Sequence, residues 1–504
     1  MKKETRKYKF MSNIVVGYIV QVLIILLQFI NRSIFVRYLP VDYLGINGLY
    51  TNILSLLSLA ELGIGNVMVY SLYKPVANDD YPRIVSLMEF YKKVYRYIIV
   101  FVSIVGILLI PFLPLIIDSN LDLFSLIIYY ILFLIGTISS YFSAHKIALL
   151  NANQDVKLQK LVTLFVTVGQ QIVQIIILVI FKQYLLYLIV QIIATVSINL
   201  IISLIVDKKY YYLKEKYEKV LINEKYFFEN VFSTALYKVG SVIINSTDNV
   251  LISSIVNLAA VGLYSNYYML VNTIQTFLSI INSSLIYSIG NLNTEDDKEK
   301  MLNVFNAMIL FYNVVACIGF ISFYYQFNDF IIWWLGNDYL LDLPTVFIIA
   351  FNFYLNAINN PIWMCREATG LFIKVKYLML IRAFINIVLS IILGICLETL
   401  GILLATAISL VVTSFWYEPN ILYRIVFEKN IIAYWKKQLK HMLTGALLCL
   451  IIVNLLNILN INIGSIMTLI VREIIIITIV VIIYILMNRK GEEIKFCKRF
   501  LFNK

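Results

Sequence analysis

Long apolar runs separated by short polar segments follow one another along almost the whole chain. About fourteen of these runs could cross a hydrocarbon layer of about 30 Å as helices. Their approximate bounds are 10–31, 45–72, 93–117, 123–147, 158–181, 184–206, 230–256, 263–289, 303–325, 344–365, 377–397, 401–424, 441–460 and 465–487. This pattern predicts an all-α polytopic membrane protein with about 14 transmembrane helices.

Polar residues interrupt the seventh run at helical spacing. At about 100° per residue they share one narrow face of a helix, which indicates a helix that lines a wet cavity. They are Thr234, Lys238, Ser241, Asn245 and Asp248. The first run carries Gly17, Gln21, Ile24, Gln28 and Asn31, followed by Arg32, at positions lower by 217.

The same offset relates further residues without a gap. It pairs Phe10 with Phe227, Asn13 with Asn230, Gly45 with Gly262, Tyr50 with Tyr267, Tyr70 with Tyr287, Ser71 with Ser288 and Asp80 with Asp297. Duplicated halves are a common plan of transporters, in which the substrate site lies between the repeats. We therefore predict two pseudo-symmetric lobes of six helices, followed by two C-terminal helices.

This repeat also predicts how the chain is divided. Residues 1–206 form an N-lobe, residues 207–229 a cytoplasmic inter-lobe linker, residues 230–424 a C-lobe, and residues 425–504 the last two helices and a basic cytoplasmic tail. The linker is charged and rich in tyrosine, so we expect it to form an amphipathic helix on the membrane surface.

Four more runs carry polar faces. They comprise Asn47, Thr51, Ser55, Ser58 and Glu61; Thr163, Thr167, Gln170 and Gln174; Asn272, Gln275, Ser279 and Asn282; and Asn352, Asn356 and Asn359. Each face taken alone is explained by hydrogen bonds between helices. Together they favour one hydrophilic cavity, with the first, second, seventh and eighth runs as its walls.

Composition and charge agree with a membrane protein. Charged residues make up 14% of the 504 residues, against about 25% in soluble proteins. All but six of the 41 lysine and arginine residues lie at the two termini, in alternate loops and at the adjoining helix ends, which places both termini in the cytoplasm. The net charge of +12 therefore reflects topology, and its dispersion argues against nucleic-acid binding.

The six remaining cations are the sharper signal for function. Lys238, Arg382 and Arg472 lie within runs, and Arg32, Arg37 and Lys182 lie near the outer ends. A cation at the centre of a membrane helix is costly and normally faces water or a partner. Snorkelling to the headgroups is an alternative explanation for Arg382 and Arg472, and Arg32 fits an ordinary interfacial arginine.

A cavity with Arg32, Lys238 and Arg382 beside amides would suit a ligand that contains phosphate and sugar, because these cations and amides match phosphate oxygens and hydroxyl groups. The five cysteines have no close pairing motif, so we expect neither a disulfide nor a metal site.

Five segments resemble those of Wzx-type polysaccharide flippases, which belong to the multidrug/oligosaccharidyl-lipid/polysaccharide exporter superfamily. The segments are Ser58-Leu-Ala-Glu-Leu-Gly-Ile-Gly65, Tyr70-Ser-Leu-Tyr-Lys-Pro75, Asn245-Ser-Thr-Asp-Asn249, Val261-Gly-Leu-Tyr-Ser-Asn-Tyr267 and Trp334-Leu-Gly-Asn-Asp-Tyr339. The resemblance covers nearly the whole chain, and its motifs mark the family better than the substrate.

The resemblance implies a flippase of the bacterial cytoplasmic membrane and not an enzyme. Such a flippase moves undecaprenyl-pyrophosphate-linked oligosaccharide from the inner to the outer leaflet by alternating access, for surface polysaccharide biosynthesis. Its partners are the lipid-linked glycan, membrane lipid, a polysaccharide polymerase and other assembly proteins. No cofactor is implied.

The resemblance also suggests roles for individual residues, which we treat as a hypothesis. Arg32, Lys238 and Arg382 would bind pyrophosphate and glycan, assisted by amides on the same polar faces. The amides are Gln21, Gln28, Asn31, Asn245, Asn272 and Gln275. Related antiporters bind a proton or sodium ion at a carboxylate, for which Glu61 and Asp248 are the candidates.

Three alternatives stay open. A lipid II flippase and an ion-coupled drug or toxin antiporter share the superfamily plan, although the first run contains no acid, which weakens the antiporter reading. An embedded glycan polymerase or acyltransferase is more remote, because the chain has neither a large outer loop nor an intramembrane histidine.

Overall fold

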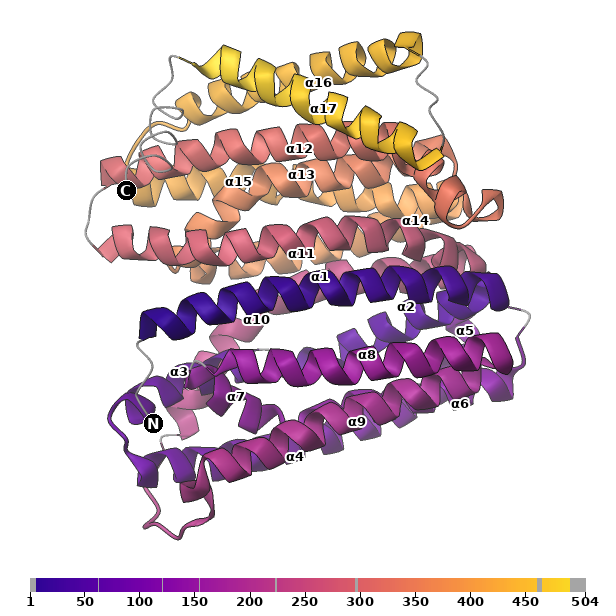
Figure 1. The fold of residues 1–504 in the computed structure, drawn as a ribbon. Coiled ribbons are helices and arrows are strands. Elements are labelled where there is room, and N and C mark those ends of the chain that lie inside the picture. The colour runs from indigo at the N-terminus through magenta and orange to yellow at the C-terminus, as the bar shows by residue number, and fades with distance from the viewer. Residues whose placement is uncertain are drawn as a thin grey trace. The chain divides into compact units, whose positions relative to one another are not determined.

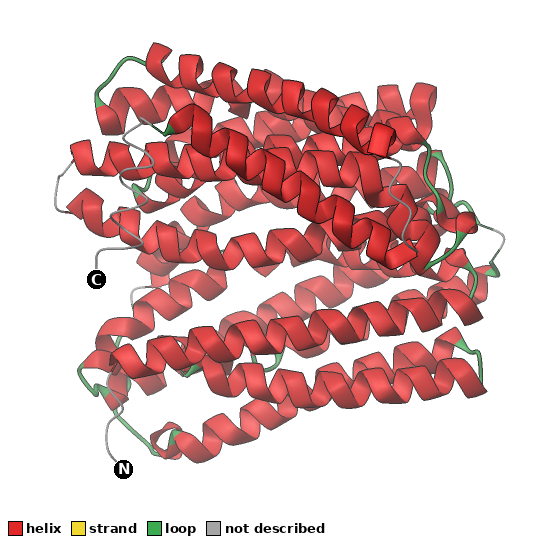
Figure 2. Cartoon of the chain, turned by 45° about the horizontal axis from the view of Figure 1, so that its top comes forward, coloured by secondary structure: helices red, strands yellow, loops and turns green. Residues whose placement is uncertain are grey.

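The computed structural model describes residues 6–61, 63–119, 121–153, 155–222, 224–294, 298–459 and 465–489. Its regular elements within these ranges are all helical, as Figure 2 shows. Nine helical stretches of the described residues are long and apolar enough to cross a membrane. The number is lower than the predicted 14 because the predicted spans 377–397 and 401–424 form one stretch, Tyr377–Phe427, and the predicted spans 45–72, 230–256, 263–289 and 344–365 do not meet this measure. The basic tail after residue 489 lies outside the described residues.

The chain divides into two compact units, Met1–Gly262 and Leu263–Lys504. The α-helices that begin in unit 1 are α1 (Arg6–Tyr38), α2 (Val41–Leu57), α3 (Ile64–Ala77), α4 (Tyr81–Leu108), α5 (Leu113–Ile116), α6 (Leu123–Tyr141), α7 (Ala144–Ala152), α8 (Val156–Ile180), α9 (Tyr184–Lys209), α10 (Glu224–Ile255) and α11 (Leu258–Thr294). Helix α10, assigned above to the C-lobe, falls in unit 1, so this division does not follow the predicted lobe boundary.

The described residues of unit 2 contain most of α11 and six further α-helices. They are α12 (Lys298–Trp334), α13 (Leu343–Ala368), α14 (Phe372–Val412), α15 (Ser414–Leu422), α16 (Ile432–Leu459) and α17 (Ser465–Asn488). Helix α14 contains a turn at Glu398, whose φ of 53° interrupts the helical backbone between two predicted spans. A five-residue π-helix, Tyr423–Phe427, follows α15.

Aspartates fix the starts of three long helices. The side chains of Asp80, Asp122 and Asp342 accept hydrogen bonds from the backbone N–H of the residue three positions later, in α4, α6 and α13. These bonds satisfy N–H groups that have no partner inside a helix. A polar cap before each apolar run therefore marks where the helix begins.

Unit 1 is a layered bundle. Helix α1 packs on α8, α8 on α9, and α9 on α6, while α2 packs on both α6 and α10. In Figure 1, α8 and α9 lie next to each other as two long rods. Tyrosines fill much of its core: Tyr50 donates a hydrogen bond to the carbonyl oxygen of Leu126, and Tyr130 donates to that of Gly106.

Two glycines paired by the repeat make a reciprocal close contact inside unit 1. A Cβ atom on Gly45 would lie 2.1 Å from the carbonyl oxygen of Leu258, and one on Gly262 would lie 2.4 Å from that of Val41. The offset of 217 pairs Val41 with Leu258 and Gly45 with Gly262. Each glycine therefore contacts the repeat counterpart of the residue four positions before it. The starts of α2 and α11 therefore cross in a locally symmetric way.

Replacing Gly45 with alanine is expected to destabilise the protein by about 1–3 kcal/mol, because the added methyl group meets backbone that cannot move away cheaply. The matched control is Gly17→Ala in α1, where a Cβ atom would meet no heavy atom within 4 Å. Thermal unfolding in detergent would test this. Equal midpoints for the two variants would contradict the close contact.

Unit 2 is organised around α12, which packs against α13, α16 and α17. In Figure 1, α16 and α17 form the hairpin that lies along α12. Cys317 and Ile321 of α12, Leu448 and Ile452 of α16, and Val480 of α17 belong to one buried apolar cluster. The last two helices are therefore packed onto this unit through their side chains.

The second predicted span is not one continuous helix. Helix α2 ends at Leu57, a 3-10 turn runs from Ser58 to Glu61, and α3 begins at Ile64. Gly63, with φ of 84°, adopts the left-handed conformation that glycine tolerates and other residues avoid. This break, which the apolar pattern did not predict, lies beside Glu61.

The prediction of an amphipathic helix in the inter-lobe linker was wrong. Only a 3-10 turn, Tyr211–Lys214, follows α9, and residues 215–222 are not helical. Asp155 accepts hydrogen bonds from Lys209 Nζ at 2.7 Å and the Tyr210 hydroxyl at 2.5 Å, and the Tyr212 ring stacks on that of Tyr81 at 4.4 Å. These tyrosines pack onto unit 1 instead of forming the apolar face of a surface helix.

Candidate functional site

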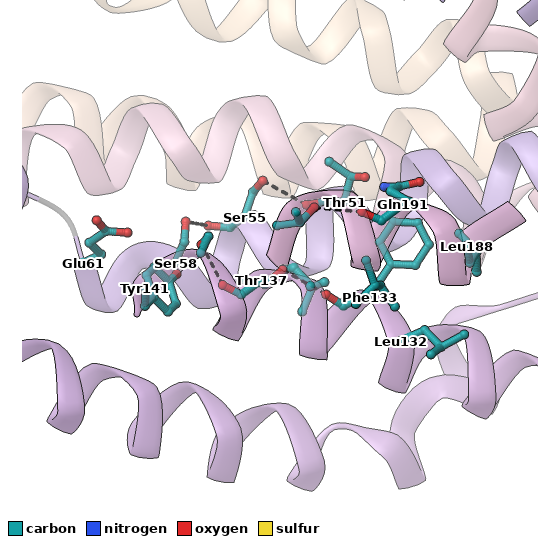
Figure 3. Close-up of a pocket in the computed structure, with 15 residues that line it drawn as sticks. Thr51, Ser55, Ser58, Glu61, Leu132, Phe133, Thr137, Tyr141, Leu188 and Gln191 are labelled. Carbon is teal, nitrogen blue, oxygen red and sulfur yellow. Dashed lines mark hydrogen bonds between the residues drawn. The ribbon is translucent and has the colours of Figure 1, made fainter. Parts of the chain in front are cut away.

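A cavity of about 370 Å³ lies inside unit 1, between α2, α6 and α9. Figure 3 shows its polar side chains following one another towards Glu61. They are Thr51, Ser55, Ser58, Glu61, Thr137, Ser140, Tyr141, Gln191 and Thr195. The apolar part of the lining includes Leu132, Phe133 and Leu188.

Five hydroxyl groups of this cavity donate their hydrogens to nearby backbone carbonyl oxygens. The Ser55 hydroxyl donates to the Thr51 carbonyl at 2.9 Å, and the Thr137 hydroxyl donates to the Phe133 carbonyl at 3.1 Å. Ser58, Ser140 and Thr195 do the same within their own segments. Because each proton is used in this way, the oxygen lone pairs remain available to the cavity, which is therefore rich in hydrogen-bond acceptors.

Glu61 lies at one end of this row of polar residues, at the break between α2 and α3. Its carboxylate accepts a hydrogen bond of 2.8 Å from the hydroxyl of Tyr95 in α4, and the Tyr95 ring stacks near that of Tyr141. Irregular backbone at membrane depth occurs where it is buried in protein or lines a water-filled space. A half-buried carboxylate at such a break is suited to binding a cation or a proton.

The predicted residues of the first span lie along α1. Gln28 is exposed, Gln21 and Arg32 are half-buried, and Asn31 is buried with 3% of its surface exposed. The Tyr187 hydroxyl of α9 donates to Asn31 Oδ1 at 3.1 Å. Asn31 therefore acts as a contact between helices inside unit 1.

The predicted residues of the seventh span lie on α10. Lys238 and Asp248 are half-buried and Asn245 is exposed, with its side-chain amide donating to the Ser241 carbonyl at 2.9 Å. The side chain of Thr234, at the start of this face, lies outside the described residues.

The remaining predicted residues belong to unit 2. Asn272 on α11 is exposed, while Gln275 on α11 and Arg382 on α14 are half-buried. The cavity of unit 1 takes in Glu61 but none of the residues predicted to contact substrate, all of which are described. The structure of each unit therefore gives the helix and the exposure of these residues without testing their role.

The polar faces divide into two kinds. Gln174 of α8 is fully buried and donates to the Tyr187 carbonyl of α9, and Asn282 of α11 donates to Asn360 of α13 at 3.1 Å, as expected for contacts between helices. Gln28, Asn245 and Asn272 instead stay exposed. Because amides in contact with hydrocarbon are costly, their exposure favours water next to these faces.

Sequence reasoning found the α2 side of the cavity and missed the other walls. Thr51, Ser55, Ser58 and Glu61 stood out as a polar face, whereas Thr137 and Ser140 of α6 and Gln191 and Thr195 of α9 were not singled out. Their spacing of three or four residues was the available signal, but each pair is too short to distinguish a cavity wall from helix contacts.

Comparison with known proteins gives the family. The family model described as polysaccharide biosynthesis protein matches residues 10–287, more than half of the chain. The search of curated proteins found no match to this chain.

Similar solved structures give the fold. The chain resembles the lipid II flippase MurJ in an inward closed conformation, with 14% identity, 94% of this chain and 98% of that chain covered, and a TM-score of 0.68. The chain also resembles an inward-facing multidrug resistance MATE family transporter of the MOP superfamily, with 13% identity and a TM-score of 0.59. This match covers 80% of this chain and 97% of that chain. A third similar structure is a MOP superfamily transporter from Pyrococcus furiosus, with 13% identity and a TM-score of 0.55. This match covers 83% of this chain and 96% of that chain.

These three proteins are named as a flippase and as transporters. The fold and the match to the family model also agree with the resemblance noted from the sequence. The chain belongs to the polysaccharide biosynthesis protein family and is a multi-pass membrane protein with the fold of MOP superfamily transporters.

Proposed function

We propose that the protein is a flippase that moves undecaprenyl-pyrophosphate-linked oligosaccharide from the inner to the outer leaflet of the bacterial cytoplasmic membrane by alternating access. The observation that carries this proposal is the position of Arg32, Lys238 and Arg382, which lie half-buried on long apolar helices of a polysaccharide biosynthesis family member. Charged donors at membrane depth suit a pyrophosphate, and the exposed amides on α1, α10 and α11 suit sugar hydroxyl groups.

In this proposal the three cations hold the pyrophosphate and the first sugars while the polyprenyl chain stays in lipid. The ligand gives up water for charge-assisted hydrogen bonds, which are about twice as strong as those between neutral groups. A polysaccharide polymerase and other assembly proteins would use the delivered glycan in the outer leaflet. A lipophilic cation is a poorer ligand, because it would meet three like charges.

The cell-level test is the sidedness of the lipid-linked oligosaccharide with and without this protein. The proposal predicts that depletion causes accumulation in the inner leaflet and loss of surface glycan, and that restoring the protein reverses both. An unchanged lipid pool on depletion would favour drug or ion antiport, and accumulation of lipid II in place of the oligosaccharide would favour the lipid II alternative.

Glu61 is the stronger candidate for coupling to a proton or sodium gradient, because it lies in the acceptor-rich cavity of unit 1. Asp248, half-buried on α10, is the other. Replacing Glu61 with glutamine is expected to lower gradient-driven transport roughly tenfold to a hundredfold, since a charge-assisted interaction of about 1.5–3 kcal/mol is lost.

This prediction has a matched control in Glu89→Gln on α4, a carboxylate that is 62% exposed and lies 3.9 Å from Lys219. Transport by both variants would be measured with and without imposed proton and sodium gradients. If Glu61→Gln responds to the gradients as the unmodified protein does, Glu61 is not the coupling residue, and Asp248→Asn becomes the variant to measure.

A further inference from the structure

A second polar cluster lies between α12 and α17 in unit 2, and none of its residues is part of the proposed substrate or coupling site. Ser322, Gln326 and Asp329 are spaced by four and three residues, so they share one face of α12. Arg472 and Glu473 meet this face from α17. Glu473 lies eight residues, about 12 Å, from the start of α17, well inside an apolar helix.

The two carboxylates of the cluster, those of Asp329 and Glu473, have different partners. Arg472 forms an ion pair of 2.8 Å with Asp329 and lies 5.5 Å from the centre of the Tyr325 ring. Glu473 accepts hydrogen bonds from the Ser322 hydroxyl at 3.0 Å and from Gln326 Nε2 at 2.9 Å. Within the ranges that the structure describes, Glu473 forms no ion pair, and both of its hydrogen-bond donors are neutral.

Gln326 supplies a second, independent observation. Its side chain is 7% exposed, and its oxygen Oε1 is buried without a hydrogen-bond partner among the described residues. This oxygen and the nitrogen that bonds Glu473 belong to one amide, so a half-turn of the amide would present Oε1 to the carboxyl group. An ionised carboxylate cannot donate to it, but a protonated carboxyl group can.

We propose that Glu473, Gln326 and Ser322 form a proton-binding site that joins the α16–α17 hairpin to α12. A proton from water binds one carboxyl oxygen of Glu473, the Gln326 amide turns, and the new O–H donates to Gln326 Oε1. Ser322 continues to donate to the other carboxyl oxygen. Release of the proton reverses these steps and restores the bond from Gln326 Nε2.

The neutral state is the one that suits the packed hairpin. In this state the Glu473 O–H meets an acceptor and the cluster contains no uncompensated carboxylate, whereas in the ionised state the carboxylate is held by neutral donors alone. The site therefore makes the attachment of α17 to α12 stronger when Glu473 carries a proton and weaker when it does not.

The neighbouring ionisable groups do not offer the same response. On α12 they are Asp329, which is paired with Arg472, and Tyr325, whose hydroxyl donates to Asn457 of α16 at 2.8 Å. Cys317 of α12, Cys449 of α16 and Tyr484 of α17 belong to the buried apolar cluster described above. His441 of α16 stacks on the ring of Tyr484.

Infrared difference spectroscopy of the full-length protein in lipid nanodiscs tests this directly. A protonated carboxyl group has a C=O stretching band that a carboxylate lacks. We expect the unmodified protein to show this band at neutral pH, Glu473→Gln to lose it, and Glu89→Gln, which removes an exposed carboxylate, to retain it. Loss of a carboxylate band in Glu473→Gln at neutral pH would overturn the proposal.

Gln326→Leu keeps the test falsifiable if Glu473→Gln does not fold. Without its acceptor, the C=O band of the protonated carboxyl group should shift to higher frequency, and an unshifted band would overturn the assigned hydrogen bond. The thermal unfolding midpoint should also fall as the pH rises through the titration of the band, in the unmodified protein and not in Glu473→Gln. These measurements need no transport substrate, so their outcome is independent of the proposed flippase activity.

Discussion

Replacing Arg366 with leucine is expected to lower the free energy of unfolding by about 3–5 kcal/mol. Arg366 lies near the end of α13, and its Nη1 atom is 2.5 Å from Oε2 of Glu418 in α15. The two side chains are 5% and 9% exposed, so the lost arginine would leave a carboxylate buried beside a helix contact. Removing one partner of a buried ion pair is costly for this reason, whereas the intact pair is worth much less.

The chain provides two controls for this effect. Lys298 and Glu428 form an ion pair of 2.8 Å whose side chains are 45% and 64% exposed, and Lys298→Leu should change stability by less than about 1 kcal/mol. The double variant Arg366→Met with Glu418→Leu should regain most of the loss, because apolar residues of similar size often replace a buried pair without cost. Denaturant titration in mixed micelles would measure all three variants. A loss in the double variant as large as in Arg366→Leu would contradict the charge argument.

Replacing Arg32, Lys238 and Arg382 together with glutamine is expected to abolish transport of the lipid-linked oligosaccharide while leaving the protein folded. A hydrogen bond to a charged group contributes about 1.5–3 kcal/mol, so each lost cation should lower affinity for the pyrophosphate by roughly tenfold or more. The three residues are half-buried and lie on three different helices, so the thermal unfolding midpoint of the variant is measured alongside its transport.

A matched triple variant separates the role of these cations from net charge. Lys92, Lys93 and Lys429 are exposed, and replacing them with glutamine removes the same charge. The two triple variants would be compared at equal protein level for surface glycan and for lipid-linked oligosaccharide in each leaflet. The assignment of the cations would be wrong if the first variant transported as well as the second.

The membrane class and most helices could be predicted from the sequence because length and apolarity decide whether a segment spans a bilayer. The break between α2 and α3 could not. The break depends on the left-handed backbone of Gly63. It also depends on the hydrogen bond that Tyr95 donates to Glu61, which lies 34 positions earlier in the chain. A pattern of apolar residues carries no information about such a contact.

The linker and the Glu473 cluster show the same limit in different ways. The tyrosines of the linker resemble an amphipathic helix in composition, but Tyr210 and Tyr212 find partners in Asp155 and Tyr81 on unit 1. Arg472, which is adjacent to Glu473, stood out in the sequence as an embedded charge. The partners of Arg472 and Glu473 lie 143 and 151 residues earlier on α12 and could be identified only from the structure.

The candidate substrate residues illustrate what periodicity can and cannot separate. It grouped Gln28 and Asn31 on one face of α1, yet Gln28 is exposed and Asn31 is buried in a hydrogen bond with Tyr187. Polar residues that face water and polar residues that bond a neighbouring helix recur at the same helical spacing, because both surroundings favour polar side chains. Burial distinguishes them, and burial depends on which helices pack together.

The central claim is tested most directly by reconstituting the purified protein in liposomes that contain polyprenyl-pyrophosphate-linked oligosaccharide in both leaflets. A membrane-impermeant reagent that modifies the glycan would report the fraction in the outer leaflet over time. The account predicts that inner-leaflet oligosaccharide becomes reactive in the presence of the protein and stays protected with the Arg32, Lys238 and Arg382 triple variant. Protection equal to that in protein-free liposomes, with the unmodified protein folded and tested under both proton and sodium gradients, would contradict it.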